Sequence, residues 1–180
     1  MALSSAALVT LAQLKSFLGI DGTHNDTRLE LNIEAASRTI QNYIGYSPVS
    51  QSYTDEFHEG DGTDRIYTKA RPITAITTIT VEDGSVDTSG VSNRTTYIDL
   101  EGYAPTRGAE ILVDYTAGYS TIPYDMQMAC LQIAGYYEAQ QDTTGLNALS
   151  SRSNDTTSRT LDDGFIDRIL GALVEYQRVM

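Results

Sequence analysis

Few residues in this chain are suited to nucleophilic or acid–base chemistry. There is one cysteine, Cys130, and there are two histidines, His24 and His58. Both histidines fall in acidic or polar turns, whereas Cys130 falls on an apolar helical stripe. A Cys–His nucleophile would need a spatial approach that the sequence leaves open. Because free cysteine is among the most buried residue types, we interpret Cys130 as a small core residue.

Two clusters of side-chain oxygens could attract a hard cation such as Ca²⁺. They are Asp21, Asn25 and Asp26, and Asp55, Glu56, Glu59 and Asp61. Neither follows an EF-hand loop, since the twelfth position counted from Asp21 is Asn32 where that loop has glutamate. We interpret both clusters as solvated turns and predict no metal site. A small β-rich module that binds carbohydrate or metal through the turns at 55–64 remains the alternative.

Compact motifs for nucleotide, hydrolase and metal chemistry are absent from the sequence. It contains no P-loop string, no GxSxG elbow, no HExxH and no CxxC pair. We therefore predict a protein without catalytic residues or a cofactor.

The 24 acidic and 12 basic residues give a formal net charge of -12. This charge opposes close approach to phosphate backbones and to anionic lipid surfaces. No run of about 18 apolar residues predicts a transmembrane helix, and the N-terminal stretch lacks the basic region of a signal peptide. With one cysteine, the chain cannot form an internal disulfide, which favours folding inside a cell.

The first part of the chain has the pattern of two helices. The first is expected to follow the N-cap Thr10 and to stop at Gly19. The second is expected to start near Thr27, which is spaced from Glu30 as in a capping box, and to end near Gly45. Its apolar residues recur at steps of three or four, as on one buried helical face. They are Leu29, Ile33, Ala36, Ile40 and Tyr43.

From about residue 51, Thr, Ile, Val and Tyr dominate between turns rich in Gly and Asp, which is typical of strands. QSYTDEFH and RIYTKA, on either side of EGDGTD, are predicted to pair as a hairpin, with Gly60 and Gly62 at positive φ. Further strands are predicted after Pro72, in TTYIDLEG and in AEILVDYTAG. The last strand has three residues on one face, which are Ile111, Val113 and Tyr115.

Helical signals return at Pro123, a residue suited to the first helical position. The apolar stripe of this helix consists of Met126, Cys130, Ile133 and Tyr137. A polar stretch without periodicity then predicts a mobile loop near 146–160. A final helix is predicted from about Asp162 almost to Met180.

The final helix is predicted to be apolar on two adjacent stripes, too wide a face to remain in water. We expect one stripe to dock on a partner, through Phe165, Ile169, Leu173 and Tyr176. We expect the other to pack in the subunit's own core, through Ile166, Leu170 and Val174.

The order of these elements predicts an α+β fold, in which a small helical core formed by both ends of the chain is interrupted by an inserted antiparallel β module. We expect residues 1–50 and 119–180 to form the core and residues 51–118 to form the insertion.

In this order, the segments resemble the head–tail connector family of tailed bacteriophages, also called adaptor or head-completion proteins. The resemblance rests on "LVTLAQLKSFLGI", "LELNIEAASRTIQNYIGY", "EFHEGDGTDRIYTKARPITAITTITVEDG" and "ILVDYTAGYSTIPYDMQMACLQIAGYYEAQ". Five residues match family positions that backbone geometry explains, and they are Gly60, Gly62, Pro72, Gly118 and Pro123. The β module is larger than in the most compact members.

The resemblance implies a structural protein of the virion neck, assembled in the host cytoplasm. Members form closed homo-oligomeric rings, typically dodecameric, beneath the portal protein. The ring joins the portal to the stopper or tail-completion protein, and a C-terminal helix engages the portal or neighbouring subunits. DNA passes through the channel without specific binding, and acidic residues facing the channel would repel its phosphates.

Overall fold

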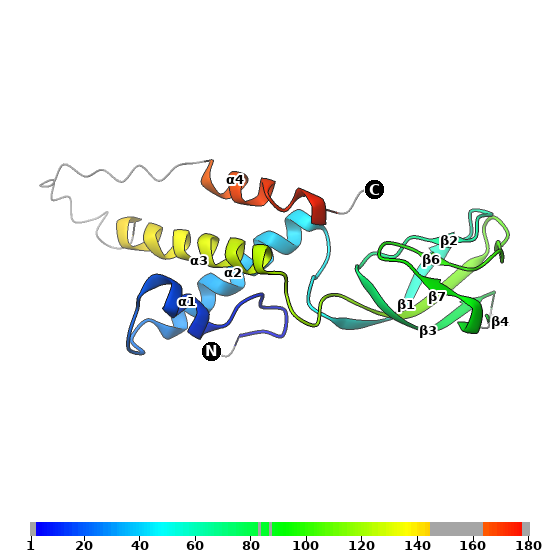
Figure 1. The fold of residues 1–180 in the computed structure, drawn as a ribbon, viewed down its shortest axis with the longest axis horizontal. Helices are drawn as coiled ribbons and strands as arrows, with labels where there is room; N and C mark the ends of the chain where they lie inside the picture. The colour runs from blue at the N-terminus through cyan, green and yellow to red at the C-terminus, as the bar shows by residue number, and fades with distance from the viewer. Residues whose placement is uncertain (1–2, 83, 87, 145–163, 178–180) are drawn as a thin grey trace, which may run out of the picture. The chain divides into compact units, whose positions relative to one another are not determined.

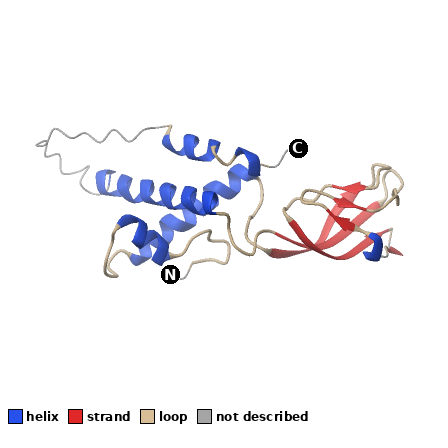
Figure 2. Ribbon diagram, viewed as in Figure 1, coloured by secondary structure: helices blue, strands red, loops and turns tan. Residues whose placement is uncertain are grey.

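The structure, a computed structural model, describes residues 3–82, 84–86, 88–144 and 164–177 (Figure 1). The chain divides into a helical unit, built from the residues before Tyr46 and after Thr121, and a β unit, residues Tyr46–Thr121 (Figure 2). The predicted α+β class is confirmed: both ends of the chain contribute to the helical core, and the inserted sheets are antiparallel.

Helix α1 (Leu11–Leu18) has the predicted ends. The Thr10 hydroxyl accepts a hydrogen bond from the N–H of Gln13 at 3.3 Å, and the Gln13 side-chain oxygen accepts one from the N–H of Thr10 at 2.7 Å. This reciprocal cap satisfies two N–H groups that the helix itself leaves without a partner. The helix ends at Gly19, whose φ of 66° is left-handed.

Helix α2 (Asp26–Ile44) buries the predicted apolar face, while Tyr43 is half-buried. Its predicted start is wrong, because Asn25 occupies the N-cap and Thr27 lies inside the helix. This start two residues earlier is favoured by Asp26, whose carboxylate lies in the first turn and pairs with Lys15 at 2.7 Å. Gly45, with φ of 87°, ends the helix as predicted.

Helix α3 (Tyr124–Thr144) starts one residue later than predicted. Pro123 is the N-cap position, since its carbonyl accepts the first helical bond from the N–H of Gln127 at 3.0 Å. Met126, Cys130 and Ile133 are fully buried, as their spacing predicts.

Polar contacts fix the register of α2 against α3. The carboxylate of Glu138 on α3 is buried, pairs with Arg28 and accepts a hydrogen bond from Asn32 Nδ2 at 2.9 Å. Thr39 and Tyr137 share a hydroxyl contact of 3.1 Å. Because a buried carboxylate without partners is costly, these bonds select one alignment of the two helices.

A second polar face of α2 holds the N-terminal segment of the chain. Glu34 accepts two hydrogen bonds from residue 4, Ser37 accepts one from the N–H of residue 8, and Gln41 donates one to the carbonyl of residue 6. These three side chains are spaced by three and four residues, so they lie on one side of the helix.

The last helix, α4 (Phe165–Gly171), is followed by the 3₁₀ turn η3 (Val174–Tyr176). The helix is therefore shorter than predicted. Its predicted start near Asp162, its predicted end near Met180 and the loop near 146–160 lie outside the described residues.

The main sheet of the β unit has the order β1-β7-β3-β4, with antiparallel neighbours. Its strands are β1 (Gln51–Glu59), β7 (Glu110–Ala117), β3 (Ile73–Val81) and β4 (Gly84–Ser85). As predicted, Ile111, Val113 and Tyr115 of β7 all face the core.

A smaller sheet has the order β2-β6-β5 and consists of β2 (Arg65–Ile66), β6 (Ile98–Asp99) and β5 (Ser92–Asn93). The short 3₁₀ helix η1 (Thr88–Gly90) precedes β5. The predicted hairpin is wrong, because β1 pairs with β7 and β2 pairs with β6. The turn between β1 and β2 carries the chain from one sheet to the other.

The predicted turn residues act in different ways. Gly62 has the positive φ that the sequence suggested, 82°, but Gly60 does not. Gly60 is required for space instead, since a Cβ there would lie 2.3 Å from the carbonyl oxygen of Thr106. Gly118 meets both constraints, with φ of 109° and a would-be Cβ 2.5 Å from the carbonyl oxygen of Val49. The peptide bond before Pro72 is cis.

Gly118→Ala is expected to destabilise the β unit by about 2 kcal/mol or more, for two reasons. The alanine would have to adopt a left-handed backbone conformation, and its Cβ would clash with the backbone of Val49, which cannot move aside as a side chain can. Gly108→Ala is the matched control, because Gly108 has φ of 83° but open space around it. Urea denaturation of both variants measures the difference. Equal losses of unfolding free energy would show that the contact with Val49 imposes no constraint.

Candidate functional site

The acidic turn at the end of β1 does not form one cluster. Asp55 lies in a β-bulge with φ of 52°, and its N–H donates to the carboxylate of Asp114 at 2.8 Å. Glu56 is buried, Glu59 is exposed, and Asp61 accepts hydrogen bonds from Thr63. Within the described ranges, no group of three or more His, Cys, Asp or Glu residues is placed to hold a metal ion.

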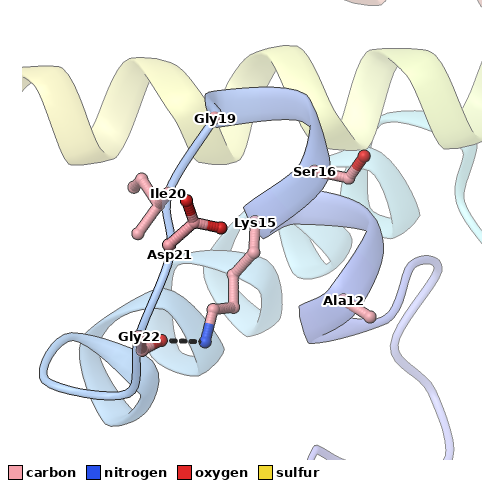
Figure 3. A pocket seen from close by; sticks show the side chains of 7 residues that line it. All are labelled: Ala12, Lys15, Ser16, Gly19, Ile20, Asp21 and Gly22. Atoms are coloured by element: carbon pink, nitrogen blue, oxygen red, sulfur yellow. Dashed lines mark hydrogen bonds between the residues drawn. The ribbon is translucent and has the colours of Figure 1, made fainter.

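The first predicted cluster is also separated by its contacts. Asn25 and Asp26 belong to the start of α2, and Asp26 is paired with Lys15. Asp21 lies on a hollow of about 570 Å³ beside the end of α1 (Figure 3). The Lys15 ammonium in this hollow donates to the carbonyl of Gly22 as well as to Asp26. Lys15 thus ties the loop after α1 to α2, which is a structural role.

The most concentrated polar chemistry in the described β unit surrounds Glu56. Its carboxylate accepts hydrogen bonds from the Tyr115 hydroxyl at 2.6 Å and from the N–H of Lys69 at 2.9 Å, and lies 2.9 Å from His58 Nε2. The Tyr115 oxygen also accepts the N–H of Ala70 at 3.2 Å. One carboxylate therefore joins β1, β7 and the loop before β3.

These bonds change the titration of both groups. Burial raises the pKa of Glu56, but hydrogen bonds from His58, Tyr115 and Lys69 outweigh it and leave that pKa below its ordinary value of 4.5. Burial, followed by the hydrogen bond to Glu56, raises the pKa of Tyr115. Tyr115 remains a neutral donor and Glu56 a charged acceptor at neutral pH, which is the combination that the hydrogen bond needs.

No sequence pattern indicated that Glu56 would be buried. The bulge between Tyr53 and Glu56 shifts the alternation of the strand, and its partner Tyr115 lies on a distant segment. One sequence feature pointed to a buried partner. The alternation of β7 directs Tyr115 into the core, where its hydroxyl requires a hydrogen-bond partner.

Cys130 is fully buried, as expected, and its sulfur lies 3.5 Å from the Ser37 hydroxyl. Burial raises the pKa of Cys130 to about 11, so the group is an uncharged thiol at neutral pH. Since the thiolate is the reactive form, this position disfavours nucleophilic chemistry.

The predicted partner stripe of the last helix is not uniformly available. Phe165 stacks on Tyr136 of α3, with ring centroids 5.1 Å apart, and Ile169 and Tyr176 are half-buried. Leu173 is only 1% exposed, which contradicts its assignment as a surface anchor.

The stripe that was predicted to pack in the core is only partly buried in the structure. Leu170 is buried as expected, but Val174 is 60% exposed. The reason is local: α4 ends at Gly171, and the tighter turn that follows rotates Leu173 inward and Val174 outward. A continuous helix would have kept both residues on their predicted stripes.

Glu56→Gln is expected to lower the free energy of unfolding by about 1–3 kcal/mol at pH 7, because it weakens charge-assisted bonds to buried donors. The contribution of the carboxylate is present above pH 4.5 and is lost as the pH falls below it, since the folded pKa is depressed. The difference between wild type and variant should therefore shrink in acid, as measured by urea denaturation at several pH values.

Glu59→Gln, an exposed change on the same strand, is the control and is expected to leave stability unchanged or slightly raised, because it removes a like charge opposite Glu110. A Glu56→Gln protein as stable as wild type at pH 7 would contradict the structural role of this carboxylate.

Comparison with known structures identifies the fold. A chain in the neck of an empty gene transfer agent particle, solved with C6 symmetry, aligns with a TM-score of 0.60 and 17% identity over 100% of this chain and 94% of that chain. A chain of the native gene transfer agent virion aligns with a TM-score of 0.61 and 16% identity, over 100% and 94%. A chain of the native neck, solved with C12 symmetry, gives 0.56 and 16%, over 100% and 93%.

No curated protein matches the sequence. The family described as head completion protein matches residues 7–160, which is most of the helical and β units and ends before α4. This match confirms the resemblance of the sequence to that family, and the chain therefore belongs to the head completion protein family.

Proposed function

We propose that this head completion protein is a non-enzymatic ring subunit that joins the portal to the stopper or tail-completion protein. The chain is a structural protein of the bacteriophage head–tail neck, and the family match over residues 7–160 is the observation that carries the proposal. Chains of similar fold occur in particle necks solved with C6 and C12 symmetry, which supports a ring, dodecameric in the virion. Assembly in the host cytoplasm is part of the proposal.

The charge of the chain suits a channel through which DNA passes. A net charge of -12 on each subunit repels phosphate, so a ring of such subunits would not retain the genome by specific binding. No helix of the described residues is long and apolar enough to cross a lipid bilayer.

Ring formation is tested with the full chain, alone and mixed with the portal protein of the same phage. Mass photometry and negative-stain electron microscopy should show a discrete assembly with rotational symmetry, or an added layer on the portal ring. A protein that stays monomeric in both samples and adds nothing to the portal would reject the proposed function.

The portal contact is proposed for the C-terminal segment, which lies beyond the family match. The structure modifies the predicted anchors. Phe165, Ile169 and Tyr176 retain partly exposed surfaces, and Val174 is exposed over 60% of its surface. Leu173 contributes indirectly, since it holds the segment on the helical unit.

Val174→Asp is expected to weaken portal binding at least tenfold, because burial of an unpaired charge in an apolar contact is costly. The melting temperature should be nearly unchanged, as Val174 contributes little to the core. Surface plasmon resonance on immobilised portal rings measures the effect. Unchanged affinity would move the portal contact away from this segment.

Leu173→Ala serves as the contrasting variant. It should lower the free energy of unfolding by about 2–5 kcal/mol, as for other buried leucines. A stability loss at Leu173 together with a binding loss at Val174 would separate the two roles of adjacent residues.

A further inference from the structure

The outer face of the smaller sheet carries an arginine and two tyrosines in contact. The guanidinium of Arg65 lies 5.3 Å from the ring centroid of Tyr97, and the rings of Tyr67 and Tyr97 are 5.7 Å apart. Ile66 of β2 and Ile98 of β6 pair with each other, are the sequence neighbours of these residues, and are buried. The alternation turns Arg65, Tyr67 and Tyr97, here called the arginine–tyrosine patch, away from the core.

This patch is both exposed and held in place. Tyr67 is 57% exposed, although aromatic side chains normally bury most of their surface. Immediately after it, Thr68 donates to the carbonyl of Ala70, and the N–H of Lys69 is bound by Glu56. The backbone behind Tyr67 is therefore fixed before any partner arrives, which lowers the entropic cost of binding.

Arg65 is suited to bind a carboxylate. A guanidinium has five N–H donors in a planar fork that matches a carboxylate. Arg65 lies over the Tyr97 ring, but in the described part of the chain no carboxylate lies within 4.0 Å of it. Arginine and tyrosine are also the residue types most enriched in interface hot spots.

The surroundings favour a protein partner over a nucleic acid. Arginine and aromatic groups also stack on bases, but Asp61, Asp64 and Asp99 lie beside this patch in a chain of net charge -12. These carboxylates repel a phosphate backbone.

A complementary surface exists on the outer face of the main sheet. Glu59 and Glu110 stand directly opposite each other on β1 and β7, and both are exposed. Like charges in opposite positions destabilise a sheet unless a cation approaches them. Phe57, 56% exposed, and its partner Leu112 lie next to this pair on the same face. This face therefore offers an aromatic ring beside two carboxylates.

We propose that the arginine–tyrosine patch of one subunit packs against the main-sheet face of a second copy, with Arg65 paired to Glu110 and Tyr67 against Phe57. The contact joins one surface of a subunit to a different surface of its neighbour, so it is heterologous. It therefore repeats from subunit to subunit, as a closed ring requires. This inference rests on the proposed ring and names its contact in the β unit.

A charge exchange tests the contact. Arg65→Glu and Glu110→Arg should each weaken self-association of the full chain roughly tenfold or more, and the double variant should recover most of the loss. Sedimentation velocity measures the association, and electron microscopy with portal measures ring formation. Glu110→Arg should not lower the melting temperature, because it relieves the repulsion with Glu59.

Arg94→Glu is the matched control, since Arg94 is an exposed arginine in the turn between β5 and β6. If wild type forms rings and Arg65→Glu is no weaker than Arg94→Glu, the contact is wrong while the ring function stands. Failure of the double variant to recover would reject the pairing of Arg65 with Glu110. Absence of rings from wild type would reject the ring and this contact together.

A nucleic-acid role for the patch is the remaining outcome. Binding of a short single-stranded DNA by wild type, lost in Arg65→Glu and unaffected in Arg94→Glu, would assign the patch to DNA and overturn the subunit contact.

Discussion

The β unit depends on the burial of one negative charge. Glu56 would be unstable in the core if its carboxylate lacked partners, and the chain supplies three: His58 on the same strand, Tyr115 on β7 and the N–H of Lys69 in the loop before β3. The need to satisfy this carboxylate also constrains the segments that carry its partners. Because Glu56 must be satisfied, the loop that carries Lys69 has to lie against the main sheet, and β2, the strand of the smaller sheet that precedes this loop, is positioned with it.

The helical unit also contains a buried carboxylate whose partners come from another element. Glu138 is buried between α2 and α3 and is satisfied by Arg28 and Asn32, so the two longest helices have one favourable alignment. Apolar packing alone tolerates sliding, whereas a buried charge tolerates very little, because any shift leaves it without partners. Such internal order would suit a subunit of the proposed ring, which would have to present the same surfaces at every position.

Sequence patterns predicted what local rules determine. The N-cap Thr10, the stops at Gly19 and Gly45 and the inward face of β7 all depend on residues close in sequence. The function was predicted from the family resemblance, because the periodicity of apolar residues indicates secondary structure and not function. Strand pairing was mispredicted, because β1 finds its partner in β7, far along the chain, and not in the segment after the turn.

The candidate sites were less predictable for the same reason. The bulge at Asp55 reverses the alternation that would show Glu56 pointing inward, and the break after Gly171 exchanges the environments of Leu173 and Val174. The pairing of Tyr67 with Tyr97 needs the register of β2 and β6, which the sequence does not reveal. Each case involves a break in regularity or a distant partner.

The proposed place of the chain in the virion is tested most directly by cryo-electron microscopy of the particles that contain it, with the neck reconstructed under cyclic symmetry. A ring subunit of the neck should appear as one helical unit and one β unit at every symmetry-related position below the portal. Neck density into which neither unit fits, or density for this chain at another place in the particle, would contradict the assignment.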